Sequence, residues 1–397
     1  MKQKINNSIH ILHIPKWYPS RIDPQFGVFI KKHIKSTSGR FLNSVVYPVK
    51  EINLHQSYET IVSFDYNIYE VIVYYKASDL SSKILSHIIS AYRYTKAFII
   101  GFQLVKKERS YPDIIHAHVL LRTGIWALIY KWIYGKPYVI SEHWSGYITG
   151  AYKSKPHYYK YLLNRIIRKA TVLISISESL KKAMISNGIV HPFFYNVPNI
   201  VDPPLRNQFQ TVEEKKELQI LTVADLVDEV KNISGIIRSL CEIKEELGSF
   251  QYHIIGDGPD RKILEKLVMD INMDKGKIIF HGKKDNNYVY QLLNEIDFLI
   301  VNSYVETFSV VTLEALVHGK PVIATSCGGP EQFINDSNGL IVSPGNQNEL
   351  QDAIIMMSKN LSNYDANKIA SSLSERFSSQ SIGDQFENIY KQVLNIK

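Results

Sequence analysis

Short apolar runs alternate with helical segments along most of this 397-residue chain, and this rhythm restricts its fold more than any other feature. Runs such as Asp113–Val119 and Pro137–His143 have the length and composition of buried strands, whereas Ile84–Lys107 repeats apolar residues at helical spacing. Strands that alternate with helices predict a parallel sheet with helices on both faces. We therefore expect an α/β protein built from doubly wound, Rossmann-like parallel sheets.

The rhythm is interrupted once, by a segment rich in proline and polar residues, and then restarts. This segment, Pro198–Glu217, has the composition of a linker. A chain of this length is also too long for a single core of ordinary size. We therefore predict two domains, residues 1–204 and 205–378, followed by an amphipathic helix near residues 379–397.

The two halves of the chain differ in charge. Residues 1–204 contain 27 Lys and Arg against 11 Asp and Glu, whereas residues 205–397 contain 19 against 27. The overall net charge of +8 therefore combines a half of +16 with a half of −8. A strongly basic first half predicts an anionic partner for that domain.

One segment of the first half, Tyr152–Lys169, contains six Lys or Arg, four Tyr and no acidic residue. Such a segment would suit an anionic membrane surface, with the tyrosines at the level of the headgroups. A solvated basic face is the commoner outcome and stays open as the alternative. Nucleic acid is not expected as a partner, because no groove-reading motif accompanies the charge.

The cysteine content and the apolar runs indicate a compartment. Two cysteines, Cys241 and Cys327, are too few for a disulfide framework and fit a reducing environment. The first residues contain no apolar stretch long enough for a signal peptide, and no uninterrupted apolar run reaches the length of a membrane span. We expect a cytoplasmic protein whose membrane contact, if it has one, is peripheral and on the inner face.

The stretch that says most about function is Asn302–Glu331, which contains Glu306 and Glu314. A buried strand, Asp297–Val301, is predicted before it, and a helical segment within it stops at Gly319. Glu306 would then lie in the loop after a strand and Glu314 in the next helix. Open α/β sheets bind ligands at this edge, and a helix N-terminus favours an anion. Two carboxylates beside such a helix start suit a ligand with both hydroxyls and phosphates, such as a nucleotide sugar.

Several motifs occur in order along the chain, and together they resemble the retaining glycosyltransferases of family 4, which have the GT-B fold. Looser matches run from Trp17 to Asp202, and the tail Phe377–Leu394 also resembles the end of these enzymes. The resemblance implies two Rossmann-like domains that face a cleft. The first domain would bind the acceptor, the second the donor, and the helix near 379–397 would pack back on the first. The motifs of the second half are Gly256–Pro259, Phe280–Gly282, Glu306–Thr325 and Cys327–Ile334.

The resemblance also implies an activity. It predicts transfer of a sugar from a nucleoside diphosphate sugar to a hydroxyl acceptor, with retention of configuration and with no metal or cofactor. The chain contains no Asp-x-Asp motif, which fits the absence of a metal. The basic first half favours a glycan or lipid-linked acceptor, as in assembly of a capsule, O-antigen or exopolysaccharide. Two alternatives stay open, a nucleotide-sugar epimerase of the same architecture and a catalytically weak donor-binding subunit of another transferase.

The paired glutamates take their roles from the resemblance. Glu306 matches the glutamate that contacts the hydroxyls of the donor sugar, and Glu314 matches the one that binds the ribose. Thr307, Phe308 and Ser309 would face the donor at the helix start, although Thr307 replaces the glycine that is commoner in the family. The plainer alternative is a pair of solvated acids near a helix start.

Four further positions match the donor site of the family. Lys231 resembles the lysine that binds the donor diphosphate, with a solvated lysine as the plainer alternative. Asp225 stands where an arginine is usual, and a carboxylate there would repel the diphosphate. Gly27 matches a glycine loop near the diphosphate, and Gly282 with Lys283 matches the segment that holds the base.

His143 matches the histidine at the junction of donor and acceptor, and with Glu306 and Lys231 it completes the predicted catalytic set. The alternative for His143 is a buried, satisfied histidine. His118 is a candidate on the acceptor side, and it shares one face of a strand with His116. A metal site there would need a third ligand, and none stands out, so no metal site is predicted.

Overall fold

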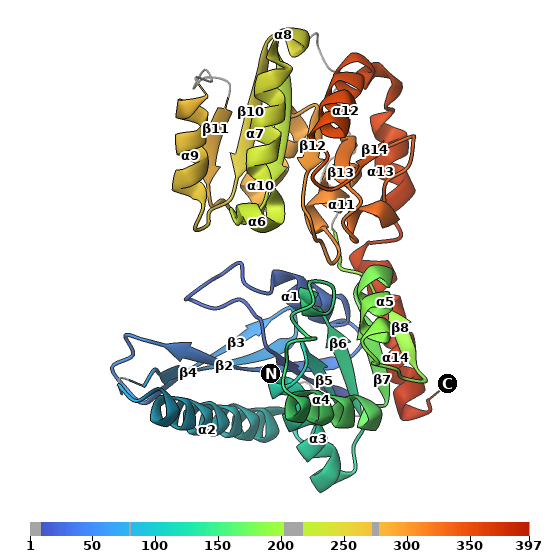
Figure 1. Ribbon diagram of the computed structural model, residues 1–397. Coiled ribbons are helices and arrows are strands. Elements are labelled where there is room, and N and C mark those ends of the chain that lie inside the picture. The colour runs from blue at the N-terminus through green and yellow to red at the C-terminus, as the bar shows by residue number, and fades with distance from the viewer. Residues whose placement is uncertain (1–8, 79–80, 202–216, 272–277, 397) are drawn as a thin grey trace. The chain divides into compact units, whose positions relative to one another are not determined.

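The computed structural model describes residues 9–78, 81–201, 217–271 and 278–396. The chain divides into two units (Figure 1): unit 1 is Met1–Ile200 together with Ser379–Lys397, and unit 2 is Val201–Ser378. The predicted linker, Pro198–Glu217, lies mostly outside the described residues.

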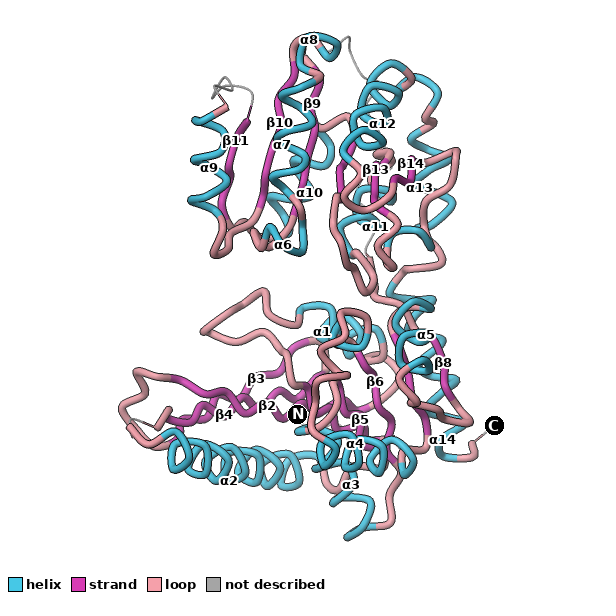
Figure 2. The backbone as a smooth tube through the Cα atoms, in the orientation of Figure 1, coloured by secondary structure: helices cyan, strands magenta, loops and turns pink. Residues whose placement is uncertain are grey.

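Unit 1 contains an eight-stranded sheet with the order β3-β4-β2-β1-β5-β6-β7-β8. Neighbouring strands are parallel except at β3, which is antiparallel to β4. The central strands are buried because helices cover both faces of the sheet (Figure 2). The strands are β1 (His10–Pro15), β2 (Leu42–Glu51), β3 (Tyr58–Asp65), β4 (Ile68–Lys76), β5 (Ile114–His118), β6 (Tyr138–Glu142), β7 (Val172–Ser175) and β8 (Phe194–Asn196).

Strand β3 is not among the strands that the sequence predicts. It pairs with β4 through a tight turn in which Tyr66 and Asn67 have φ angles of 46° and 67°. Turns with two positive φ angles usually contain glycine, and a tyrosine in the first position makes the turn hard to recognise. The sheet of unit 1 therefore has an antiparallel edge that the βαβ rhythm does not reveal.

The helices of unit 1 include a layer of three, α2, α3 and α4. The rings of Phe98 on α2 and Trp126 on α3 stack at 4.2 Å, and Lys131 Nζ on α3 donates a hydrogen bond to the Lys169 carbonyl of α4. All three lie on the same face of the sheet in Figure 1. The helices are α1 (Val28–Ser36), α2 (Lys83–Arg109), α3 (Arg122–Tyr134), η1 (Ser145–Tyr147), α4 (His157–Lys169), α5 (Glu178–Ser186) and α14 (Ser379–Leu394).

Helix α14 belongs to unit 1 although it follows unit 2 in the chain. Its residues Phe386 and Tyr390 are buried in one core with Phe41 and the ends of β1 and β5. The Arg40 guanidinium forms ion pairs with two acids of α14, at 2.6 Å to Asp384 and 2.8 Å to Glu387. The core of unit 1 is therefore complete only when this late segment is in place.

Unit 2 contains a six-stranded parallel sheet with the order β11-β10-β9-β12-β13-β14. Its strands are β9 (Leu218–Val223), β10 (Phe250–Ile255), β11 (Ile278–Gly282), β12 (Phe298–Val301), β13 (Val322–Thr325) and β14 (Gly339–Val342). Its helices are α6 (Asp228–Lys231), α7 (Ile233–Glu242), α8 (Lys244–Leu247), α9 (Arg261–Asp270), α10 (Asn286–Glu295), α11 (Val310–Val317), η2 (Pro330–Gln332), α12 (Gln347–Lys359), η3 (Leu361–Asn363) and α13 (Ala366–Ser374). The predicted fold class, two doubly wound parallel-sheet domains, is confirmed.

Apolar residues recur at helical spacing through Lys231–Leu247, yet this segment is divided among three helices, α6, α7 and α8. Asn232 has a φ of 48°, so the chain turns between α6 and α7. The Asp228 carboxylate accepts a hydrogen bond of 2.8 Å from the Ser234 backbone N–H and so satisfies a donor in the first turn of α7. A local left-handed residue therefore interrupts a segment whose apolar spacing is continuous.

Within the described ranges, no helix is both long enough and apolar enough to cross a bilayer.

Candidate active site

The loop between β12 and α11 carries the residues that the sequence singles out. It begins after Val301 and ends at Ser309, which has a φ of 62°. The Ser309 hydroxyl is hydrogen-bonded to the Thr312 hydroxyl at 2.7 Å, and Ser309, the N-cap residue, makes no side-chain hydrogen bond to the first N–H groups of α11. Uncapped N–H groups at a helix start are suited to an anion.

Glu306 of this loop forms an ion pair with Lys231, the last residue of α6. Lys231 Nζ lies 2.6 Å from Glu306 Oε1, and the Ser303 hydroxyl donates to the same oxygen at 2.9 Å. The two side chains are 21% and 15% exposed, so both charges are only partly in water. A ligand that reaches this position would meet a positive and a negative group that already hold one another in place.

The glycines of the Cys327–Glu331 segment allow this loop to pack closely. A Cβ on Gly329 would lie 2.8 Å from the carbonyl carbon of Phe308 and 3.0 Å from Cβ of Glu306. The Glu306 backbone N–H donates to the Cys327 carbonyl at 2.9 Å, and Glu331 accepts from the Gly328 N–H at 2.8 Å. The two matched motifs therefore form one structural unit, in which the second shapes the first.

The aromatic residue in the middle of the loop points inward. Phe308 is 1% exposed, and its ring packs against Phe333 at 5.0 Å and Phe377 at 6.3 Å. Of the three residues predicted at the helix start, Phe308 could therefore meet a ligand only through its backbone. Thr307 is half-buried and Ser309 is buried beside the start of α11.

Glu314 lies in the second turn of α11, as predicted, and is 9% exposed. The Tyr290 hydroxyl of α10 donates a hydrogen bond of 3.1 Å to Glu314 Oε1. Burial and this hydrogen bond fix the carboxylate, which is the arrangement expected of a group that accepts hydrogen bonds from ribose hydroxyls.

Asp225 and Lys231 follow the same strand, β9, but differ in environment. Asp225 is exposed to solvent, whereas Lys231 is partly buried and paired with Glu306. Solvent screens an exposed carboxylate, so any repulsion of a diphosphate by Asp225 is weakened.

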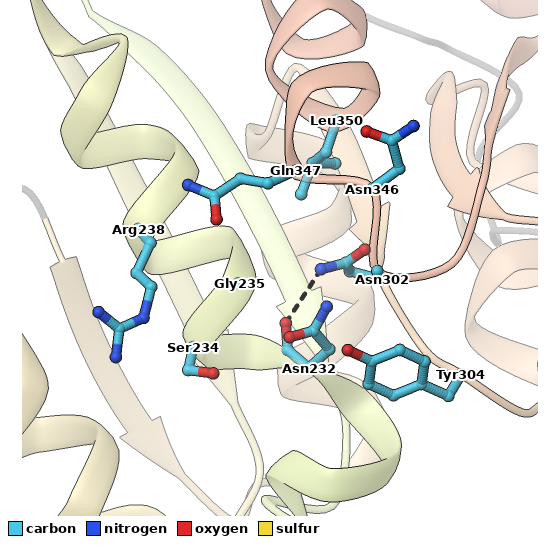
Figure 3. Close-up of a pocket in the computed structure, with 10 residues that line it drawn as sticks. Asn232, Ser234, Gly235, Arg238, Asn302, Tyr304, Asn346, Gln347 and Leu350 are labelled. Atoms are coloured by element: carbon cyan, nitrogen blue, oxygen red, sulfur yellow. Dashed lines mark hydrogen bonds between the residues drawn. The ribbon is translucent and has the colours of Figure 1, made fainter.

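A polar pocket of about 170 Å³ adjoins the loop, and the sequence did not reveal it. Figure 3 shows side chains from α7, from the loop after β12 and from the start of α12 around the pocket. The Asn302 side chain donates a hydrogen bond of 3.1 Å to the Asn232 carbonyl. Helices α7 and α12 both begin at this edge of the sheet, and these two helix starts are the sequence feature that could have indicated the pocket. The polar side chains include Asn232, Ser234, Arg238, Asn302, Tyr304 and Gln347.

The three remaining donor-site candidates lie at turns. Gly282 ends β11, and its carbonyl accepts a hydrogen bond of 3.0 Å from the Gly256 N–H. Lys283, the next residue, is exposed. Gly27 precedes α1 with a φ of 73°, and a Cβ there would lie 2.4 Å from the Trp17 carbonyl carbon. Close packing alone therefore requires the glycine at position 27, and its role toward a donor stays a prediction.

His143 follows β6 in unit 1 and is 4% exposed. Neither ring nitrogen has a hydrogen-bond partner among the described residues, and the ring lies 5.1 Å from Phe29. Burial lowers the pKa of His143 well below 6.5, so the ring is neutral at pH 7. A neutral imidazole with two unpaired nitrogens can both donate and accept hydrogen bonds, which fits the predicted contact with a sugar hydroxyl.

His118 is fully buried in a cluster of histidines. Its Nε2 is hydrogen-bonded to His13 Nδ1 at 3.1 Å, and its ring stacks on His116 at 4.0 Å. The expectation that no third candidate ligand accompanies His116 and His118 is wrong, because β1 lies beside β5 and places His13 opposite His116. The nitrogens of these three rings lie within 4.8 Å of one another.

The partners of this cluster are those of a neutral hydrogen-bond network. His13 Nε2 is bonded to Asn43 at 3.0 Å, and the two nitrogens of His116 are bonded to Tyr390 and Ser141 at 2.6 and 2.8 Å. Five of the six nitrogens in the three rings thus have a hydrogen-bond partner that a bound metal would have to displace or reorient. Burial lowers the pKa of His13 to about 3. The prediction of no metal site stays a prediction.

Comparison with known families places both units. Residues 70–204 match the family model described as Glycosyltransferase Family 4, and residues 205–371 match the model described as Glycosyl transferases group 1. The two matches adjoin one another without a gap. They cover strands and helices of both units, including the whole β12–α11 loop.

Individual relatives are distant. The N-acetyl-alpha-D-glucosaminyl L-malate synthase of Bacillus anthracis is 27% identical over 302 residues, which are 72% of this chain and 76% of the relative. The lipopolysaccharide 1,6-galactosyltransferase of Escherichia coli is 23% identical over 56% of this chain and 61% of its own. The structure of Anabaena HepE with UDP and glucose has a TM-score of 0.70 at 17% identity, covering 97% of this chain and 100% of that one.

Proposed function

Because the chain belongs to the GT-B glycosyltransferases of family 4, we propose that it is a retaining enzyme that transfers a sugar from a nucleoside diphosphate sugar to a hydroxyl acceptor. The observation that carries the proposal is the Lys231–Glu306 ion pair beside the uncapped start of α11. The lysine and the N–H groups suit a diphosphate, and the glutamate suits the hydroxyls of a sugar.

In the proposed reaction, the protein stabilises the leaving diphosphate. Lys231 Nζ and the leading N–H groups of α11 would bind the phosphate oxygens as their negative charge grows when the glycosidic bond breaks. Each well-placed donor to such an oxygen contributes about 3–4 kcal/mol to the lowering of the barrier. These groups would supply the positive charge without a metal or another cofactor.

Glu306 and His143 would act on the sugar, and Glu314 on the ribose. Glu306 would accept hydrogen bonds from the sugar hydroxyls, and Glu314, held by Tyr290, would accept them from the ribose. His143 is neutral and has no other partner among the described residues, so it could bond a hydroxyl of the sugar or the acceptor. No protein nucleophile is proposed, and the acceptor would attack from the face that the diphosphate leaves, which retains the configuration.

Two relatives support a choice of substrates. The Anabaena structure was determined with UDP and glucose, which supports a uridine diphosphate sugar as the first donor to test. The E. coli relative acts in lipopolysaccharide synthesis, and residues 1–204 of this chain carry a charge of +16. We therefore propose a lipid-linked glycan acceptor in surface-polysaccharide assembly, used at the cytoplasmic face of a membrane.

The experiment that tests this function begins with thermal shifts against a panel of uridine, guanosine and adenosine diphosphate sugars. A bound donor raises the melting temperature by mass action. The selected donor is then incubated with polyprenyl-diphosphate-linked sugars, and the anomeric configuration of the product is read by NMR. Product with the donor's configuration supports the proposal, and inverted product contradicts it. Conversion of the donor alone would indicate an epimerase, and binding with neither transfer nor hydrolysis would indicate a donor-binding subunit.

A further inference from the structure

The layer formed by α2, α3 and α4, here called the helical face, exposes several large apolar side chains. Trp132 on α3 is 88% exposed, and Ile133 beside it is 64% exposed. On α2, Ile84, Ile88 and Tyr92 recur every four residues and are 59–75% exposed, so they form one stripe along the outer side of the helix. Single exposed apolar residues are ordinary, but several on adjoining helices mark a binding surface.

The same face is strongly basic. The helices contain Lys or Arg at six positions in α2, two in α3 and four in α4, and Glu108 is their one acidic residue. On α4, Tyr158 and Tyr161 are 76% and 68% exposed among these cations. A surface that combines positive charge with exposed tyrosine, tryptophan and isoleucine is complementary to an anionic membrane, where headgroups carry the charge and the chains accept the apolar groups.

An apolar groove of about 250 Å³ lies between α2 and α3 within this face. Phe98 and Phe102 of α2 and Trp126 and Tyr130 of α3 form its walls, and the β-sheet forms its floor. At its rim Ile99 is 42% exposed. The groove is therefore an apolar hollow that begins at the surface, and its apolar lining suits a hydrocarbon chain.

We propose that the helical face docks on an anionic lipid bilayer, and that the groove between α2 and α3 receives a hydrocarbon chain of one lipid. The positive charge favours an anionic bilayer over a second copy of this chain as the partner, because two such basic faces would repel each other. The apolar stripe favours a bilayer over a purely ionic partner, since burial of several large apolar side chains in lipid adds to the electrostatic attraction. Docking would hold the enzyme where a lipid-linked acceptor is found, and so it extends the proposed function.

The first test is co-sedimentation of the full chain with phosphatidylcholine vesicles, with and without phosphatidylglycerol, in the absence of donor and acceptor. Binding should be at least tenfold stronger to the anionic vesicles and should weaken at high salt. Equal binding to both vesicles, or no binding, overturns the proposal. Because no substrate is present, this result does not depend on whether the chain transfers sugar.

Two pairs of variants test the surface itself. Trp132→Ser/Ile133→Ser removes apolar contacts and Arg165→Glu/Arg168→Glu reverses two exposed charges, and each should weaken binding to anionic vesicles at least tenfold. Helix α9 of unit 2 supplies matched controls, Ile263→Ser/Met269→Ser and Lys262→Glu/Lys266→Glu, at exposed positions, and these should bind like the parent. Circular dichroism establishes that each variant is folded. If the test and control variants lose binding equally, the face is not the docking surface.

The groove is tested by fluorescence, because Trp126 lines it. In a Trp132→Phe variant bound to anionic vesicles, lipids with brominated chains should quench the tryptophan fluorescence of the protein. The additional change Trp126→Phe should abolish most of this quenching. Quenching that persists without Trp126 overturns the part of the proposal that concerns the groove. If Trp132→Ser/Ile133→Ser changes the sedimentation mass of the free protein but not its vesicle binding, the face joins copies of the chain and the bilayer proposal is wrong.

Discussion

The carboxyl edges of the two sheets use polar side chains in opposite ways. In unit 1, the histidines around β1, β5 and β6 are buried and neutral, and His143 has two unpaired ring nitrogens among the described residues. In unit 2, a glutamate of the loop after β12 and a lysine at the end of α6 form an ion pair at a partly exposed position. Both edges belong to doubly wound sheets, so the fold alone does not determine which kind of group is used.

Burial explains the difference. An imidazole can lose its proton and enter the interior as a neutral hydrogen-bonding group, whereas a lysine or glutamate that stays charged needs a partner and water nearby. Unit 1 therefore depends on pH through its histidines. In unit 2, the positions of the charged Lys231 and Glu306 side chains depend on their contact with each other. The following predictions test this contrast, beginning with the largest effect.

Mild acid should destabilise unit 1 more than unit 2. Burial lowers the pKa of six histidines of unit 1, to about 3 for His13 and about 4 for His10 and His33. The unfolded chain binds protons near pH 6.5 that the folded unit binds only at lower pH, so stability is full above pH 6.5 and falls below it. Each histidine contributes a loss of about 1.4 kcal/mol per pH unit at most.

Unit 2 has only three described histidines with lowered pKa values, so acid should destabilise it less. In unit 1 the pKa of Glu142 is raised, which stabilises the folded unit in acid, but this is one group against six histidines. Hydrogen exchange between pH 7.5 and 5.5, corrected for the intrinsic rate, should thus show β5 losing protection before β12. The variant His10→Asn should reduce the pH dependence, whereas His157→Asn at an exposed position of α4 should not. Loss of protection in β12 first would contradict the contrast.

Removal of either member of the charged pair should lower activity next most strongly. Lys231→Ala and Glu306→Ala should each reduce kcat/KM about hundredfold, or roughly 2.7 kcal/mol, because in the proposed reaction each group contacts the donor more strongly in the transition state. The double variant should lose less than the sum, since the two groups touch at 2.6 Å. Glu229→Ala, an exposed acid on α6, is the matched control and should keep full activity. Full activity in either single variant would mean that the site is elsewhere.

The smallest effect is expected at Asp225. Because this carboxylate is exposed, its repulsion of a diphosphate is screened, and Asp225→Ala should tighten donor binding only about two- to fivefold, less than ~1 kcal/mol. Titration calorimetry at low and high salt should show the gain shrinking with salt. Asp270→Ala, exposed on α9, should change nothing. Weaker binding by Asp225→Ala would show that the carboxylate contacts the donor directly.

The sequence predicted well what depends on neighbours in the chain. The strand before Asn302 and the stop at Gly319 are local signals, and they placed Glu306 in a loop and Glu314 in a helix, as observed. The helix near 379–397 was likewise evident from its apolar spacing. Such features need no knowledge of which strands become neighbours.

The features that were missed depend on contacts between distant segments. His13 joins His118 only because β1 pairs with β5, about a hundred positions later. The polar pocket needs the starts of α7 and α12 at one edge, and the apolar groove needs α2 against α3. The contact of Lys231 with Glu306 spans 75 positions, and their shared role was suggested by family resemblance and not by any local pattern.

The place of α14 has a consequence for synthesis of the protein. A ribosome makes β1, β5 and their neighbours first, then all of unit 2, and only then the helix that fills the core of unit 1. While unit 2 is being translated, His116 still lacks its hydrogen-bond partner Tyr390, and Phe41 still lacks the rings that cover it. The half of the protein that is made first is therefore the half that finishes folding last.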